Sequence, residues 1–176
     1  MHKTSLAVIH VRTRPGRRAQ GVMQAGALHL PVALGRSGIR ANKREGDGGT
    51  PRGTFRLRRL WWRADRTLRP QTALMSRRIG PDVGWCEDPR NRAYNRPIRV
   101  PPGSTADRLW REDHLYDLIV EIDHNTRPRI AWRGSAVFIH VAREGFSPTA
   151  GCVALNRPAL HRLLSQVGPH TRLTVG

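Results

Sequence analysis

The chain has 176 residues, 38% of them hydrophobic, which is enough for one domain with a core, and we predict a single domain over residues 1–176. Its formal net charge is +18, from 31 Lys and Arg against 13 Asp and Glu, which attracts polyanions but also fits a GC-rich coding bias that loads the surface with arginine. The absence of an apolar run of 18 residues excludes a transmembrane helix. Cys86 and Cys152 form no CxxC pair and the histidines show no metal-ligand spacing, so the sequence predicts no metal site.

The N-terminal third predicts short strands and a turn-rich loop. Leu6–Val11 and Gly26–Leu34 favour strands separated by a basic turn at Arg12–Arg18. The N-terminal run alternates like a strand and lacks the apolar region and cleavage site of a signal peptide, so we predict none. Residues 35–49 are rich in glycine and lead into Thr50-Pro51-Arg52-Gly53-Thr54-Phe55, where a strand begins.

The rest of the chain predicts further strands and two helices. Thr105 and Asn156 are suitable N-caps, because Thr and Asn side chains accept hydrogen bonds from the first turn of a helix. Gly168 is a suitable helix stop. The expected elements are an irregular segment at Ser76–Arg99, a short helix at Thr105–Asp113, strands at Leu118–Asp123, Ala136–Val141 and Leu173–Val175, and a helix over residues 157–167.

The residues around Cys152 indicate nucleophilic chemistry. His140 ends an apolar, strand-like run, a loop rich in Gly, Ser and Pro follows, and Thr149-Ala150-Gly151-Cys152 leads into a second apolar run. An imidazole can take the proton of a thiol. A glycine before the nucleophile allows a turn in which backbone N–H groups face a developing oxyanion. A buried, inert cysteine and a core histidine are the alternatives that these residues alone leave open.

This segment resembles the signature of the L,D-transpeptidases, the YkuD-type catalytic domain. His140 matches the family's base, Thr149 its Ser or Thr, and Gly151 and Cys152 its Gly-Cys pair. Ala150 stands where most members have a second histidine, and Ala154 where many have Asn or Arg. The Thr-Pro-x-Gly-x-Phe motif at residues 50–55 resembles a second hallmark of the family, about 100 residues upstream in the expected order.

The resemblance implies a mostly β fold, a compact barrel or sandwich with short peripheral helices. It implies that Cys152 is the nucleophile and His140 the base, that the backbone N–H groups of Gly151 and Cys152 bind the oxyanion, and that the carbonyl of Val141 orients the imidazole. A backbone-orienting or substrate-contacting role is open for Thr149. The remaining substrate-binding candidates are His124, Arg143, Arg157 and Trp85, each with a structural alternative as a strand end, a solvated arginine or a buried aromatic anchor.

The implied activity is acyl transfer on peptidoglycan stem peptides through a thioester, in the cell envelope and without metal or organic cofactor. Such a reaction forms 3-3 cross-links and serves cell-wall biogenesis and cell shape, and carbapenem β-lactams are the expected inhibitors. Two alternatives remain: an L,D-carboxypeptidase or amidase with the same Cys-His site, or a non-catalytic basic module that binds the wall or nucleic acid. The basic residues are spread along the chain, which favours anionic wall polymers over a specific nucleic-acid site.

Overall fold

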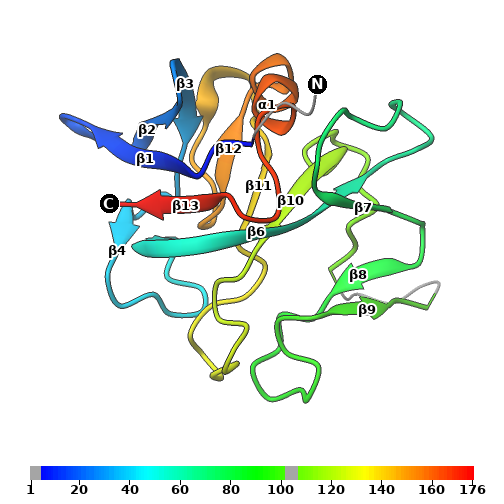
Figure 1. Cartoon of the computed structure of the whole chain (residues 1–176). Helices are drawn as coiled ribbons and strands as arrows, with labels where there is room; N and C mark the ends of the chain where they lie inside the picture. The colour runs from blue at the N-terminus through cyan, green and yellow to red at the C-terminus, as the bar shows by residue number, and fades with distance from the viewer. Residues whose placement is uncertain (1–4, 102–106) are drawn as a thin grey trace.

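The computed structural model describes residues 5–101 and 107–176. Strands dominate this part of the chain, and the helical segments are the 3-10 turn η1 and the helix α1 (Figure 1). In chain order the elements are β1 (Val8–Arg14), β2 (Arg17–Ala25), β3 (Leu28–Ala33), β4 (Ile39–Arg40), β5 (Thr50–Pro51), β6 (Gly53–Trp62), β7 (Met75–Arg78), β8 (Val83–Trp85), β9 (Pro97–Arg99), β10 (Leu118–Ile122), β11 (Phe138–Val141), η1 (Glu144–Phe146), β12 (Val153–Leu155), α1 (Arg157–Leu164) and β13 (Arg172–Val175).

The main sheet closes on itself as a barrel. Its strand order is β10-β11-β12-β3-β2-β1-β13-β6-β7, and β10 also pairs with β6, so every strand except β7 belongs to the closed part. The pairs β1–β13, β11–β12 and β6–β7 are parallel, and the others in the sheet are antiparallel. Closure leaves few free strand edges, and it confirms the mostly β, barrel-like fold that the resemblance implied.

The barrel interior is filled by alternating side chains of these strands. Ile9 and Val11 of β1 point inward and are fully buried, whereas Arg12 is exposed. Leu160 and Leu163 of α1 pack into the same cluster. The N-cap predicted for this helix is present, because Asn156 Oδ1 accepts a hydrogen bond from the Ala159 N–H at 2.8 Å.

A second apolar cluster covers the outer side of β10 and β11 and determines where the site can form. Ile119 and Phe138 face this cluster, while their neighbours Val120 and Ile139 face the barrel interior. The segment that carries β8 and β9 lies to one side of the barrel in Figure 1 and contributes Trp85. Both faces of β10 and β11 are therefore buried, which explains why their sequences are nearly continuous apolar runs.

Two sequence predictions need correction. The stretch predicted as a basic turn is a hairpin, with β1 running to Arg14, β2 starting at Arg17, and Pro15 and Gly16 forming the turn. Residues 107–113 of the predicted helix are irregular, and residues 105 and 106, with the proposed cap, lie outside the described residues. Tertiary contacts override the weak helix signal here, because the Arg108 guanidinium donates to the carbonyls of Pro81 and Pro101.

Candidate active site

Cys152 and His140 line the same pocket, which has a volume of about 220 Å³. They reach it from adjacent parallel strands, since β11 and β12 pair Ile139 with Val153 and His140 with Ala154. His140 shares the outer face of β11 with Phe138, and Cys152 immediately precedes β12. The other lining residues are Arg111, Leu115, Tyr116, Arg143, Ser147, Pro148, Thr149, Ala150 and Ala154.

The thiol of Cys152 is held at the bottom of this pocket. Its side chain is 7% exposed. The S–H can donate to the carbonyl of Ala136, with Sγ 3.3 Å from the oxygen, and the N–H of Phe138 approaches Sγ at 3.4 Å. Burial raises the pKa of the Cys152 thiol to about 12, although the Phe138 N–H opposes this shift. Burial therefore favours the protonated thiol.

The imidazole of His140 is oriented by its own backbone. Nδ1 lies 2.8 Å from the carbonyl oxygen of Val141, which accepts a hydrogen bond from a protonated Nδ1. That tautomer leaves Nε2 as a proton acceptor. Burial lowers the pKa of His140 to about 4, against the effect of the Val141 carbonyl. The contact with Val141 implied by the family resemblance is present, and it fixes a neutral imidazole in the form that a base requires.

The turn before the cysteine is built from Thr149 and Gly151. Thr149 Oγ1 donates to the Cys152 carbonyl at 2.7 Å and accepts the Gly151 N–H at 3.1 Å. Gly151 has a φ of +148°, and a Cβ at this position would lie 2.8 Å from the carbonyl oxygen of Gly49. Thr149 thus orients the turn. The Gly151 N–H is engaged by Thr149, which argues against the oxyanion role predicted for it.

The family model for the L,D-transpeptidase catalytic domain, YkuD, matches residues 7–175. The chain belongs to the YkuD family. No match was found among curated proteins or among solved structures. Because the match spans nearly the whole chain, it includes the Thr-Pro-x-Gly-x-Phe motif, His140 and the turn at Cys152.

A loop behind the nucleophile supports this YkuD site. Lys43 is only 7% exposed, and its Nζ lies 2.6 Å from Asp47 Oδ1 and 2.7 Å from the carbonyl of Arg44. The same carboxylate accepts the N–H groups of Arg44 and Gly49, each at 2.8 Å. Asp47 therefore fixes the position of the Gly49 carbonyl, against which Gly151 packs.

Trp85 lies beneath the YkuD pocket and outside its lining. Its ring meets Phe138 edge-on with centroids 4.9 Å apart, and its indole N–H donates to Asn95 Oδ1 at 3.0 Å. The same Asn95 oxygen accepts the N–H of Ala136 at 3.1 Å, and Asn95 Nδ2 donates to the carbonyls of His124 and Asn125. Trp85 is thus a buried anchor for the Ala136 segment that contacts the thiol.

His124 and Arg157 also lie away from the catalytic pocket. His124 Nε2 is 3.1 Å from the Arg133 carbonyl, and its ring lines a different hollow that it shares with Lys43. Arg157 pairs with Asp117 at 2.5 Å. The sequence offered four substrate-binding candidates besides Thr149, namely Trp85, His124, Arg143 and Arg157. Of these, Arg143 lines the pocket with Cys152.

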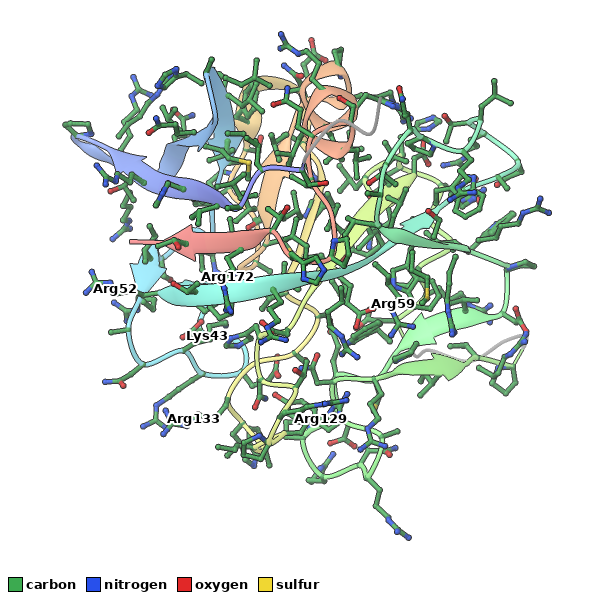
Figure 2. All side chains as sticks on the ribbon, in the orientation of Figure 1. Lys43, Arg52, Arg59, Arg129, Arg133 and Arg172 are labelled. Carbon is green, nitrogen blue, oxygen red and sulfur yellow. The ribbon has the colours of Figure 1, made fainter. Side chains whose placement is uncertain are left out.

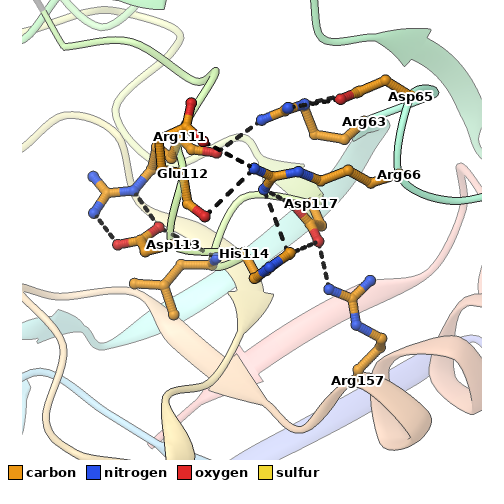
Figure 3. Close-up of polar contacts among 10 residues, drawn as sticks. Arg63, Asp65, Arg66, Arg111, Glu112, Asp113, His114, Asp117 and Arg157 are labelled. Atoms are coloured by element: carbon orange, nitrogen blue, oxygen red, sulfur yellow. Dashed lines mark hydrogen bonds and ion pairs between the residues drawn. The ribbon is translucent and has the colours of Figure 1, made fainter.

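Sequence reasoning missed the loop that forms the opposite wall of the pocket. This loop carries Arg111 and Tyr116, whose ring meets the His140 ring edge-on at 5.3 Å. Asp117 holds the loop, since its carboxylate, 2% exposed, binds Arg66 at 2.8 Å, His114 at 2.9 Å and Arg157 (Figure 3). The charged run from Arg111 to His114 has the pattern of a solvated segment, and the anchoring carboxylate of Asp117 pairs with Arg66, 51 residues away, so the local sequence carried no signal for this wall.

The described residues contain no group of three or more His, Cys, Asp or Glu side chains placed to hold a metal ion. Cys86 and Cys152 are both free thiols. Within residues 5–101 and 107–176, no helix has the length and apolarity needed to cross a membrane.

Proposed function

We propose that the chain is an L,D-transpeptidase that transfers an acyl group between peptidoglycan stem peptides through a thioester on Cys152. The observation that carries this proposal is the shared pocket, in which the thiol faces the same space as an imidazole of fixed tautomer. The donor is a stem tetrapeptide, attacked at the carbonyl of its third residue. The setting is the cell envelope, where new cross-links contribute to wall biogenesis and cell shape.

Proton transfer accompanies bond formation in this mechanism. Burial favours the neutral forms of both the thiol and the imidazole, so a resting thiolate–imidazolium pair is disfavoured. As Sγ forms its bond to the carbonyl carbon, Nε2 of His140 takes the thiol proton. When the C–N bond breaks, His140 returns this proton to the departing nitrogen of the terminal D-alanine.

The second half-reaction regenerates the enzyme. An amine of a second stem attacks the thioester carbon, His140 accepts a proton from that amine, and the Cys152 sulfur leaves and is reprotonated by the imidazolium. If water replaces the amine, the same residues perform the L,D-carboxypeptidase reaction. No metal or organic cofactor enters either sequence of steps.

Backbone and arginine groups supply the remaining contacts in this proposal. The Cys152 N–H is our candidate oxyanion donor, since the Gly151 N–H is hydrogen-bonded to Thr149. Arg111 and Arg143 line the pocket and are suitable partners for stem carboxylates. Thr149 contacts the substrate while it holds the turn. The supporting roles proposed for Trp85, His124 and Arg157 are to fix the Ala136 segment, the loop that follows β10 and the Asp117 loop.

Intact-mass measurement with a carbapenem tests the nucleophile. We expect wild-type protein to gain one carbapenem mass, Cys152→Ala to gain none, and Cys86→Ala to react normally. An adduct of unchanged yield in Cys152→Ala would place the nucleophile elsewhere. Product analysis on purified stem tetrapeptides then separates the activities, because transpeptidation yields dimers, hydrolysis yields tripeptides, and a non-catalytic binding module yields neither.

A further inference from the structure

A cluster of arginines lies on the barrel wall around β6, away from the catalytic pocket. We name it the arginine face and define it as Arg52, Arg56, Arg127, Arg129, Arg133 and Arg172. Figure 2 shows Arg52 and Arg172 beside β6, with Arg133 and Arg129 on the loop that follows β10. The lining of the catalytic pocket contains none of these six side chains.

The face is hollowed in two places. One hollow of about 580 Å³ is lined by Arg56 and Arg127 together with Arg58 and Arg59. A second of about 320 Å³ is lined by Arg52, Arg127 and Arg133. Arg127 lines both hollows, so they form one continuous basic surface rather than two isolated sites.

Like charges are crowded on this surface. Arg172 of β13 lies directly opposite Arg56 of β6 in their antiparallel pairing, and both are exposed. Like charges in that position destabilise a sheet. Burial together with the neighbouring Arg96, Arg58 and Arg127 lowers the pKa of Arg129. The fold therefore carries an electrostatic cost here, and a bound anion would relieve it.

Asp123 is an acidic side chain that lines both hollows. Within the described residues, no ion pair involves any of its six arginines. Glu121 is already paired with Arg58 and Arg59, each at 3.0 Å, and Asp123 accepts the backbone N–H of Arg56. The arginines drawn in Figure 3, on and around the Asp117 loop, are paired with acids.

We propose that the arginine face binds peptidoglycan through the carboxylates of its stem peptides and so retains the enzyme on its polymeric substrate. This rests on the proposed function. Guanidinium groups pair with carboxylates through two hydrogen bonds. Trp132, 57% exposed beside Arg133, offers a flat apolar ring face of the kind that covers the C–H face of a sugar. A polymer with sugar rings and closely spaced carboxylates matches both features.

The binding test uses Cys152→Ala protein, so that no acyl-enzyme forms, and measures co-sedimentation with purified sacculi. Arg56→Gln/Arg172→Gln removes the opposed pair, and Arg69→Gln/Arg162→Gln removes two exposed charges elsewhere. We expect the first pair to weaken binding about tenfold and the second to leave it nearly unchanged. Binding should fall steeply between about 50 mM and about 200 mM salt. Sacculi stripped of stem peptides by an amidase should retain little protein.

Several results would overturn the proposal. Equal loss in both double variants would mean that net charge alone drives binding, and undiminished binding to stripped sacculi would exclude the carboxylates. The protein could also bind duplex DNA or anionic lipid vesicles as tightly as it binds sacculi, with the same loss in Arg56→Gln/Arg172→Gln. That result would mean that the face is a general polyanion surface. Should that variant melt early, Arg52→Gln/Arg133→Gln replaces it. The catalytic proposal is tested separately, by carbapenem acylation of each double variant with Cys152 intact. Because the face lies outside the pocket, acylation should not depend on these arginines.

Discussion

Two titratable side chains share the catalytic pocket, and burial pushes both toward their neutral forms. The Cys152 thiol has a pKa raised to about 12 and the His140 imidazole a pKa lowered to about 4. A resting thiolate–imidazolium pair would make the thiol more acidic than a free one. The structure gives the opposite direction, because neither charge is solvated at the bottom of this pocket.

This difference yields a test of when the proton moves. If His140 acts only during attack, His140→Ala should leave the pH profile of Cys152 alkylation by a small neutral reagent nearly unchanged, with reactivity appearing only above about pH 9. The same variant should lose carbapenem acylation. His124→Ala is the control and should change neither measurement. An alkylation profile that moves to higher pH in His140→Ala would instead reveal a resting ion pair.

The depressed pKa of His140 also predicts how stability depends on pH. Between its unfolded value of 6.5 and its folded value of about 4, the unfolded chain binds more protons, so stability is lost as pH falls through this window. The loss is of the order of 3 kcal/mol. The lowered carboxyl pKa values of Asp47 and Asp117 act mainly below this window. The free energy of unfolding, measured with denaturant from pH 7 to pH 4, should fall less for His140→Gln than for wild type. If both proteins lose stability in parallel, the titration of His140 is not the cause.

At the scale of elements, the sequence predicts what is local and misses what is distant. The Thr-x-Gly-Cys turn, His140 at the end of β11 and the cap of α1 follow from neighbouring residues, and the family match covers all three. The loop that carries Arg111 and Tyr116 does not follow from local pattern. It joins the pocket because Asp117 pairs with Arg66 and Arg157, 51 and 40 residues away, and such pairings leave no periodic signal in a single sequence.

Loss of the Asp117 carboxylate should therefore disturb the loop that carries Arg111 and Tyr116. Asp117→Asn leaves Arg66, Arg157 and His114 without their shared carboxylate, and breaking a buried ion network by removing one partner costs about 3 kcal/mol or more. We expect a lower melting temperature and slower carbapenem acylation, as the wall of the pocket loosens. Asp88→Asn is the control, because Asp88 is 47% exposed and its ion pair is with Arg90, which is 82% exposed. Similar melting of the two variants would contradict the anchoring role.

At the scale of the whole molecule, charge is distributed unevenly over a barrel whose closure protects its strand edges. The net charge of +18 opposes the compact state through self-repulsion. The Asp117 network offsets this repulsion near the catalytic pocket, whereas the arginine face is left without ion pairs among the described residues. A local repulsion is added around β6, where the exposed Arg56 and Arg172 oppose one another.

Salt should for this reason stabilise the folded protein. Raising the ionic strength shortens the Debye length to about 10 Å at 0.1 M, which screens repulsion between exposed charges, so the melting temperature should rise from low salt to about that concentration. Arg56→Gln/Arg172→Gln should melt at or above the wild-type temperature in low salt and gain less from added salt, because the opposed pair is gone. Arg69→Gln/Arg162→Gln lowers the net charge equally without touching that pair, and its gain from salt should stay closer to that of wild type. If the two double variants respond alike, the repulsion is spread over the molecule and the arginine face carries no special cost.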